Sequence, residues 1–483
     1  MSEIVTDLRP IIVAVLSAVL SLVVSAHVVL HKRDNRAAVG WVGLIWLVPV
    51  LGSVLYAWFG INRIRRRGTA LRQMGLDIRP VPRDSMTEWR VVATKLSEPH
   101  GYLAALARIV AHVTLRPLVG GTRLTPLANG DEAYPEMLAA IDEAKTSVAL
   151  STFLFDNDAT GRAFAEALGR AVSRGLRVRV LIDAVGSRYS WPSILGELRR
   201  RKVRVARFLE AVVPWRMPFL NLRLHRKILV VDGSLGFTGG MNIRDGHVMH
   251  RKPRRPVQDL HFRVEGPVVE HLMMAFAEDW AFSAKEVLEG EAWFPELPAV
   301  GSIVARGISD GPGEDFDKAR FTILGAIATA RQEIVVVTPY FLPDVELIGA
   351  LNVAAMRGVD VRIVLPGVNN QFLVKWASTA LLWQVLQRGC RVFLTAPPFD
   401  HSKLMVVDGA WTLVGSANWD PRSLRLNFEF NIECYDEVFA SRMSEIVHDK
   451  LRGAREITKA EVDARSLPVQ LRDGVARLFS PYL

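Results

Sequence analysis

The stretch HRKILVVD at 225–232, followed by GGMN at 239–242, returns in the same chain as HSKLMVVD at 401–408, followed by GSAN at 415–418. Both copies read H-x-K-x4-D-x6-G-[GS]-x-N with unchanged internal spacing. A single H-x-K on an apolar strand is usually structural. Two copies that keep histidine, lysine and asparagine, while Arg226 and Ser402 between them differ, indicate two half-sites that face one phosphate.

The sequence around each copy shows a wider repeat of short apolar runs and helical stretches. The runs 147–153 and 333–339 are each followed by a helical stretch that ends in Arg-Gly and by a second apolar run. Apolar strands buried on both faces and alternating with helices predict a mixed or parallel sheet covered by helices. We therefore expect an α/β protein with two similar domains, 111–290 and 291–483, related by a pseudo-two-fold repeat.

Two long apolar stretches precede this body, at about 10–30 and 37–61. Each is long enough to cross a hydrocarbon core of roughly 30 Å as a helix. A cleaved signal peptide fits poorly, because acidic Glu3 and Asp7 stand where lysines are expected. We predict a two-helix transmembrane hairpin over 1–68, joined to the body by a linker over 69–110.

The charges that flank the two stretches predict an orientation. The outer flanks carry more basic residues than the connecting loop, which favours the cytoplasmic side for the outer flanks and the body. The outer set is Arg9, Arg63, Arg65, Arg66, Arg67 and Arg72, and the loop set is Lys32, Arg33 and Arg36. The expected location is the inner (plasma) membrane, with a multi-pass anchor and the catalytic part on the cytoplasmic side.

Bulk composition narrows the class of partner. The chain has 483 residues, a net charge of +10 and 50% hydrophobic residues. The positive charge favours an anionic partner, and the apolar content favours a membrane over a nucleic acid. The only cysteines, Cys390 and Cys434, exclude a disulfide scaffold and a four-cysteine zinc site but leave a single bridge open.

The repeated string carries the candidate chemistry. Leu224–Val231 and Asp400–Val407 have strand composition, and residues two apart on a strand share a face. His225 should therefore project with Lys227, and His401 with Lys403. Asp232 and Asp408 lie an odd number of positions away at a turn, where they are better placed to bond backbone or a partner histidine. Gly239 and Gly415 open loops that return Asn242 and Asn418 to the site as amide donors.

Two histidines suit a two-step displacement at phosphorus. One imidazole attacks and forms a phosphohistidine, while the other protonates the departing alkoxide and later deprotonates the incoming alcohol. The lysines and asparagines would stabilise charge on the phosphate oxygens. No other cluster with metal-ligand spacing occurs, so we expect neither a metal nor a cofactor.

The sequence resembles the phospholipase D superfamily, whose signature is this paired motif, and more narrowly bacterial cardiolipin synthases. Further similar segments extend from the anchor to the C-terminus. They are 46–52, 56–60, 221–227, 239–243, 338–344, 418–423, 427–429 and 477–481.

The resemblance implies transfer of a phosphatidyl group from one phosphatidylglycerol to another through a phosphohistidine, giving cardiolipin and glycerol. The catalytic set it implies is His225, Lys227, Asp232, His401, Lys403 and Asp408, with His225 as nucleophile and His401 as acid and base. The substrate-binding set it implies is Asn242, Asn418, Asp259 and Glu429, the last two at positions where the family carries an acidic residue bonded to a catalytic histidine. The implied partners are phosphatidylglycerol and other anionic phospholipids in a bilayer, with no nucleic acid.

Some residues depart from the family pattern. Asp400 and Ser402 stand where leucine and alanine are expected, and 367–370 lacks an expected acidic residue. These departures concern the choice of acceptor. Three functions stay open: a cardiolipin synthase, a membrane-anchored phospholipase D-type hydrolase or phosphodiesterase, and a catalytically silent scaffold that binds anionic lipid. A homodimer is possible.

Overall fold

We describe the protein from a computed structural model. The structure describes residues 2–32, 35–60, 89–114, 116–210, 222–311 and 317–480. These residues form two units, an N-terminal helical unit and a large α/β unit that begins after residue 70. The arginines at 63, 65–67 and 72, on which the predicted orientation depends, lie outside the described residues.

The N-terminal unit contains one helix that is long and apolar enough to cross a membrane, the stretch Ile11–His31 of α1 (Ser2–His31). The second predicted helix, 37–61, is not continuous. It is divided into α2 (Asn35–Leu47), α3 (Pro49–Leu55) and a π-helical turn η1 (Tyr56–Gly60). The break falls at Val48, because the ring of Pro49 disfavours the helical conformation for the residue before it.

The helices of this unit pack on one another through a small apolar cluster. Val28 of α1 lies against Ile45 of α2 and Tyr56 of η1, and all three side chains are buried. Polar contacts add to the cluster, since Ser21 Oγ donates to the carbonyl of Ile45 at 3.4 Å. His27 Nδ1 also lies 2.9 Å from the Tyr56 hydroxyl.

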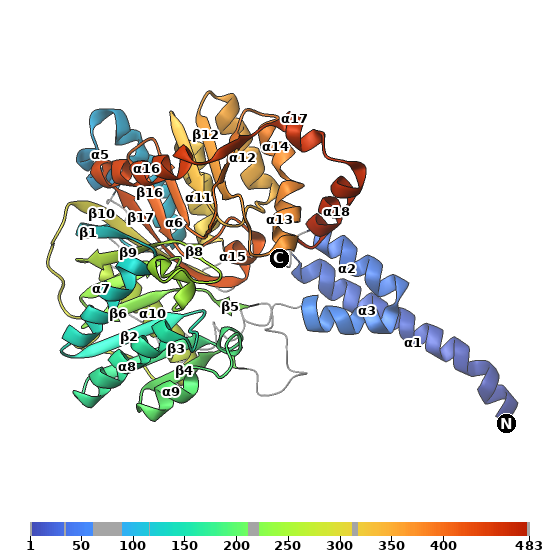
Figure 1. Ribbon diagram of the computed structural model, residues 1–483. Helices are drawn as coiled ribbons and strands as arrows, with labels where there is room; N and C mark the ends of the chain where they lie inside the picture. The colour runs from blue at the N-terminus through green and yellow to red at the C-terminus, as the bar shows by residue number, and fades with distance from the viewer. Residues whose placement is uncertain are drawn as a thin grey trace. The chain divides into compact units, whose positions relative to one another are not determined.

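The α/β unit is built on one long mixed sheet whose two halves have the same strand order (Figure 1). The first half runs β1-β9-β7-β6-β2-β3-β4, and the second runs β10-β17-β16-β15-β11-β12-β13-β18. The first-half strands are β1 (Val119–Ala128), β2 (Ser147–Thr152), β3 (Arg177–Asp183), β4 (Arg204–Phe208), β6 (Ile228–Val231), β7 (Leu235–Gly239) and β9 (Leu260–Glu265). The second-half strands are β10 (Ile303–Asp310), β11 (Glu333–Val337), β12 (Asp360–Pro366), β13 (Arg391–Thr395), β15 (Leu404–Val407), β16 (Trp411–Gly415), β17 (Asn427–Tyr435) and β18 (Arg455–Ile457). The predicted pair of similar α/β repeats is confirmed.

The two halves join through antiparallel pairing of their first strands, β1 with β10. Within each half three strands are parallel, β2-β3-β4 and β11-β12-β13, and the strand that follows the motif histidine pairs antiparallel to the first of them. The repeated strings therefore lie at matching positions on the two sides of the join.

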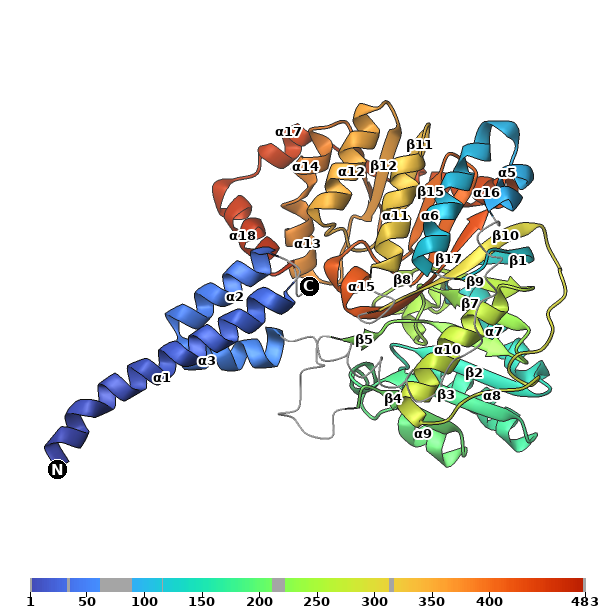
Figure 2. The ribbon, with the colours of Figure 1, turned by 180° about the vertical axis from the view of Figure 1, so that it is seen from behind.

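Helices cover the sheet on both faces (Figure 2). The first repeat contributes α7 (Asn129–Glu143), α8 (Ala159–Ser173), α9 (Leu195–Arg200) and α10 (Val269–Ala284). The second contributes α11 (Lys318–Thr329), α12 (Val345–Met356), α13 (Phe372–Thr379), α14 (Leu382–Leu386), α15 (Pro421–Arg425), α16 (Glu437–Arg452), α17 (Lys459–Asp463) and α18 (Leu467–Leu478). Side chains of α10 and α16 belong to one apolar core that takes strand residues from both repeats.

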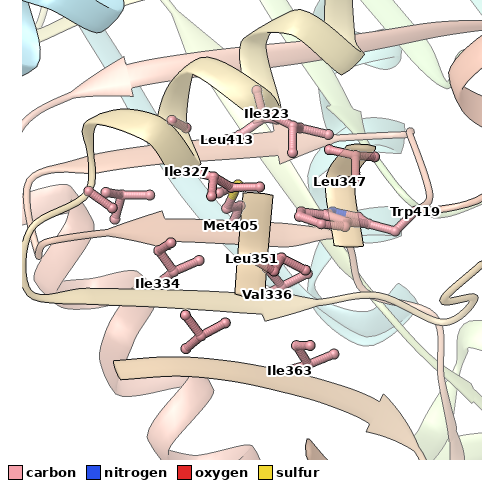
Figure 3. Close-up of a cluster of buried hydrophobic side chains, with 14 of the residues drawn as sticks. Ile323, Ile327, Ile334, Val336, Leu347, Leu351, Ile363, Met405, Leu413 and Trp419 are labelled. Atoms are coloured by element: carbon pink, nitrogen blue, oxygen red, sulfur yellow. The ribbon is translucent and has the colours of Figure 1, made fainter. Parts of the chain in front are cut away.

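Each repeat has a further core on the opposite face of its sheet. Figure 3 shows the core of the second repeat, where Ile323 of α11 and Leu351 of α12 lie against strand residues. Ile334 and Val336 of β11 face this core, whereas Val335 faces the shared one. Alternate residues of a strand point to opposite faces, so burial on both sides explains the continuous apolar run.

The segment that we expected to be a linker is packed structure from residue 89 onward. It forms α5 (Trp89–Lys95), the 3-10 helix η3 (Glu98–Leu103) and α6 (Ala104–Thr114). Leu103, Leu106 and Val110 are buried in the core of the second repeat, where α6 packs on α11. The segment therefore belongs to the α/β unit, and its apolar helical face explains why.

Candidate active site

Each motif histidine lies in a break between two short strands. His225 follows β5 (Arg223–Leu224) and precedes β6, and His401 follows β14 (Phe399–Asp400) and precedes β15. We predicted one continuous strand at each place, and this was wrong. The chain pairs with the other repeat before the histidine and with its own repeat after the lysine, so the strand cannot run through.

The short strands before the histidines cross to the opposite repeat. β5 pairs in parallel with β17 of the second repeat, and β14 pairs in parallel with β8 (Val257–Gln258) of the first. The backbone N–H of His225 donates to the carbonyl of Phe428 at 2.9 Å, and that of His401 donates to the carbonyl of Gln258 at 2.7 Å. Each histidine is thus held in place by the repeat to which it does not belong.

The histidine rings are oriented by carboxylates in the same crossed manner. His225 Nδ1 lies 2.9 Å from Glu429 Oε2, and His401 Nδ1 lies 2.8 Å from Asp259 Oδ2. Both carboxylates are buried, and in the tautomer with hydrogen on Nδ1 each accepts that hydrogen, which leaves Nε2 of each ring as the nitrogen that can react. Lys403 Nζ also lies 2.9 Å from His401 Nδ1. The structure thus brings both sequence-predicted acidic residues to the histidines.

The two lysines are buried beside the histidines. Lys227 Nζ donates to the carbonyl of His225 at 2.6 Å, and Lys403 Nζ donates to that of His401 at 2.5 Å. Burial lowers the pKa of Lys227 to about 7 and that of Lys403 to about 8. A bound anion would favour the charged form of both lysines and so raise their pKa values back toward the usual range.

The two asparagines approach the site from the loops after β7 and β16, and they are held differently. Asn242 Oδ1 accepts from the backbone N–H of Leu154 at 3.1 Å. The amide group of Asn418 donates to Ser423 Oγ at 3.1 Å, while its Oδ1 is buried without a partner among the described residues. Both side chains are buried, so each has a fixed orientation toward its loop.

Asp232 and Asp408 are not brought to the histidines. Asp232 accepts from the backbone N–H of Thr146 at 2.7 Å and of Ser147 at 3.0 Å, and Asp408 accepts from the N–H of Gln332 at 2.8 Å. Both residues have positive φ, 51° and 50°, at the turn that ends the motif strand. Their carboxylates clamp the start of the neighbouring strand, as the odd spacing from the histidines predicted.

The electrostatics differ between the two histidine–carboxylate pairs. Burial opposes ionisation of Glu429, but the charge and hydrogen bond of His225 and the charge of Lys227 outweigh it, so the pKa of Glu429 is lowered. Burial raises the pKa of Asp259, with Lys403 opposing. Glu429 also accepts from Ser416 Oγ at 2.6 Å, a contact that adds to its stabilisation as an anion.

Burial disfavours the charged form of both histidines in the free site. Burial lowers the pKa of His225, and Glu429 opposes this shift. Burial together with the charges of Lys403, Lys227 and His225 holds the pKa of His401 well below its usual range. The charges of both lysines lower the pKa of each histidine, so these four side chains lie in one electrostatic neighbourhood.

Sequence reasoning missed several buried groups that support the site. Asp183, at the end of β3, accepts from the N–H of Leu224 at 2.9 Å and so fixes the strand before His225. Arg226, between the histidine and the lysine, is paired with Asp279 of α10 at 2.7 Å. In the second repeat Asp400 is paired with Lys450 of α16 at 2.7 Å. Asp400, which departs from the family pattern at this position, is thus explained by its ion pair with Lys450.

Two further histidines lie near the carboxylate of the first repeat. His247 is buried, and its Nδ1 lies 3.1 Å from the carbonyl of Val257. His261 is buried with both ring nitrogens unpartnered among the described residues. Burial lowers the pKa of His247 to about 3 and that of His261 to about 4, so both rings are neutral. Neither belongs to the repeated string, which is why the repeat did not reveal them.

Comparison with known families matches most of the chain. The family described as cardiolipin synthase, phospholipase D-like domain, matches residues 137–280 and 323–450. The family described as phospholipase D-nuclease N-terminal matches residues 19–60. The first match contains both motif histidines and both carboxylates.

Individual relatives extend this likeness to nearly the whole chain. Cardiolipin synthase A of Pseudomonas fluorescens is 31% identical over 470 residues, which cover 96% of each chain. Cardiolipin synthase A of Pseudomonas syringae pv. syringae is 32% identical over 465 residues, which cover 95% of each chain. Among solved structures, phosphatidylserine synthase of Haemophilus influenzae has the same fold, with a TM-score of 0.63 and 14% identity over 78% of this chain and 100% of its own. The chain therefore belongs to the phospholipase D-like cardiolipin synthase family.

Proposed function

We propose that the protein is a cardiolipin synthase that transfers a phosphatidyl group from one phosphatidylglycerol to another and releases glycerol. The observation that carries this proposal is the crossed pairing of His225 with Glu429 and of His401 with Asp259. This arrangement supplies two rings with free Nε2 atoms and two carboxylates that can stabilise positive charge on those rings.

In the first step Nε2 of His225 attacks the phosphorus of phosphatidylglycerol. His401 enters this step as an imidazolium, protonated from solvent when the phosphate anion binds. The bond between phosphorus and the glycerol headgroup oxygen breaks, and that oxygen takes the proton from Nε2 of His401. His225 is the better nucleophile because the phosphorylated ring carries positive charge, and Glu429 is the carboxylate whose pKa is lowered. The bound phosphate anion favours the imidazolium of His401, and the burial and lysine charges that lower its pKa then make it give up the proton readily.

In the second step the headgroup hydroxyl of another phosphatidylglycerol attacks the phosphohistidine. His401 removes the hydroxyl proton, the bond between nitrogen and phosphorus breaks, and cardiolipin leaves. Lys227 and Lys403 balance charge on the phosphate oxygens through both steps, with Asn242 and Asn418 as further phosphate-binding groups. Asp232 and Asp408 hold the motif turns and do not touch the substrate.

The anchor is proposed to be a helical hairpin in the plasma membrane, with the catalytic unit on the cytoplasmic side. Support comes from the apolar length of α1 and from its packing on α2 and on the turn at Tyr56. The chain around Val48 would then lie within the bilayer. Its freed backbone groups are partly bonded, since Gly52 N–H donates to the carbonyl of Val48 at 2.7 Å.

Purified full-length protein in vesicles of phosphatidylglycerol tests the proposed reaction. Cardiolipin and free glycerol should appear in equal amounts without nucleotide. Rapid acid-free quenching of a reaction with labelled lipid should leave the label on His225. Phosphatidic acid as the main product would instead indicate a hydrolase, and label on His401 would reverse the assigned roles.

A further inference from the structure

Exposed aromatic residues lie one ring away from His225. The ring of His225 contacts Phe153, with centroids 5.5 Å apart, and Phe153 contacts Tyr189 at 6.2 Å. Tyr189 belongs to the segment that follows β3, and two residues later Trp191 is 97% exposed. A fully exposed tryptophan is uncommon on a soluble surface and indicates a contact that the isolated chain does not make.

The second repeat has an equivalent segment beside His401. The ring of His401 contacts Tyr340 at 6.0 Å, and the Tyr340 hydroxyl donates to Asn370 Oδ1 at 2.8 Å. Asn370 lies in the segment after β12, where Val368 is exposed and Phe372 is 63% exposed. The strands β3 and β12 are equivalent in the two repeats. Both exposed segments therefore follow the carboxyl ends of parallel strands. The histidines lie at this same end of the strands.

A third exposed apolar surface adjoins the second of these segments. α13 begins at Phe372, and α18 packs against it, as both views show (Figures 1 and 2). On α18 four exposed apolar side chains recur at helical spacing and form one face. They are Leu467, Leu471, Val475 and Leu478.

Basic side chains are interleaved with these apolar ones. Arg188 precedes Tyr189, Lys375 lies one turn after Phe372, and Arg472 on α18 lies over the ring of Trp376 at 4.4 Å. All three cations are exposed. Tryptophan, tyrosine and basic side chains next to aliphatic ones are the residues that favour the headgroup region of a bilayer.

We propose that the segments after β3 and β12, together with the apolar face of α18, form a rim that inserts into the headgroup region of an anionic bilayer. The rim presents both histidines to lipid phosphates at the level of the membrane surface. This inference rests on the proposed function, because it takes the substrate to be a two-chain anionic phospholipid. A protein partner seated on the rim would stand between the histidines and such a lipid.

Labels on the full-length protein test the insertion directly. The native cysteines, Cys390 and Cys434, are both buried, so a cysteine added at the surface can be labelled selectively with an environment-sensitive fluorophore. The variants are W191C, F372C and L471C. The control is K145C. Lys145 is exposed two residues before β2, at the opposite end of the strands from the histidines.

In phosphatidylglycerol vesicles we expect labels at 191, 372 and 471 to shift to shorter wavelength and to be quenched by lipids brominated on their acyl chains. The label at 145 should do neither. Quenching at 191 and 372 equal to that at 145 would overturn the proposal. A shift without quenching by bromine would indicate that a second copy of the chain, and not lipid, covers the labels, and would also overturn it. Quenching at 191 and 372 alone would remove α18 from the rim.

A kinetic comparison separates the rim from the chemistry. The double variant W191S/F372S should raise the KM for phosphatidylglycerol in vesicles about fivefold or more. Its kcat on a short-chain, monomeric phosphatidylglycerol should stay within about twofold of the parent. An unchanged KM on vesicles would contradict the role of the rim. The labelling result does not depend on turnover, so a failure of the proposed transferase activity would be seen separately.

Discussion

The two repeats place the same reacting groups around the site but support them in different ways. In the first repeat the residue between histidine and lysine is Arg226, which reaches back to an acidic partner on α10. In the second repeat the charges of this ion pair are exchanged. The acidic partner, Asp400, lies on the strand, and the basic partner, Lys450, lies on the equivalent helix α16. The duplicated chain has kept the groups that touch phosphate and changed the ion pairs behind them.

The carboxylates show the same contrast. Glu429 accepts from His225, from Ser416 Oγ at 2.6 Å and from the amide of Asn427 at 3.1 Å. Asp259 accepts from His401 and from the N–H of Leu260 at 2.8 Å. Gly240 stands where the second repeat has Ser416, so this position offers Asp259 no hydroxyl. Two pairs of equal geometry therefore differ in how firmly the negative charge is held, which suits different roles for the two histidines.

Removal of either histidine should give the largest effect. We expect His225→Ala and His401→Ala each to lower the rate of cardiolipin formation by at least about 10⁴-fold, because each removes a group that forms or breaks a bond. The two variants should differ in the labelled intermediate, which only a chain that retains His225 can carry. Covalent label in His225→Ala, measured after denaturation, would break the assignment of roles.

Neutralising the carboxylates should come next. We expect Glu429→Gln to lower kcat by about 10³-fold and Asp259→Asn by about 10²-fold, since an amide neither fixes the tautomer nor stabilises the cationic ring. Glu429 has the larger effect because it faces the phosphorylated ring. Equal losses in steady-state assays, with unchanged thermal unfolding, would mean that the extra donors around Glu429 have no catalytic consequence.

The buried lysines predict an alkaline limb in the pH profile. Each lysine is charged below its pKa, about 7 for Lys227 and about 8 for Lys403, and loses its charge as the pH rises. We expect kcat/KM, which reports the free enzyme, to fall by about tenfold per pH unit between pH 7 and 8 and by about a hundredfold per unit above pH 8. The limb in kcat should lie at higher pH, because bound phosphate restores the lysine charge. Coincident limbs in kcat and kcat/KM would contradict this account.

Substitutions at the equivalent positions 240 and 416 should give the smallest losses of kcat, and the two losses should differ. We expect Ser416→Ala to lower kcat by about three- to tenfold, because it removes one donor from a carboxylate that keeps others. Gly240→Ala should cost more, about 10- to 100-fold, since its Cβ would stand 2.1 Å from Asp259 Oδ1. Kinetic assays of both variants, with thermal unfolding as the control, decide the order. A reversed order would show that Asp259 can move without loss.

The repeat made much of this site predictable from the sequence. Two strings with the same spacing located the histidines, lysines and asparagines, and the odd spacing of Asp232 predicted its place at a turn. The interrupted strands could not be foreseen. They depend on two-residue pairings between distant segments, β5 with β17 at 204 positions and β14 with β8 at 142, and local composition carries no signal for such pairings.

Other features were hidden because they break the repeat. Asp183 stands where the second repeat has Pro366, so the comparison of repeats gave no reason to select it. Arg226 and Ser402 looked like variable spacers, although both are buried. The sequence predicts a linker over 69–110 because α11, on which α6 packs, lies more than 200 residues further on. Long-range packing decided each case.

The crossed pairing has a consequence for the protein during its synthesis. His225 leaves the ribosome well before Glu429, which follows it by 204 positions. A chain that ends before residue 429 therefore carries an attacking imidazole without the carboxylate that orients it. Such truncated copies lack the oriented His225, so they should form no phosphohistidine.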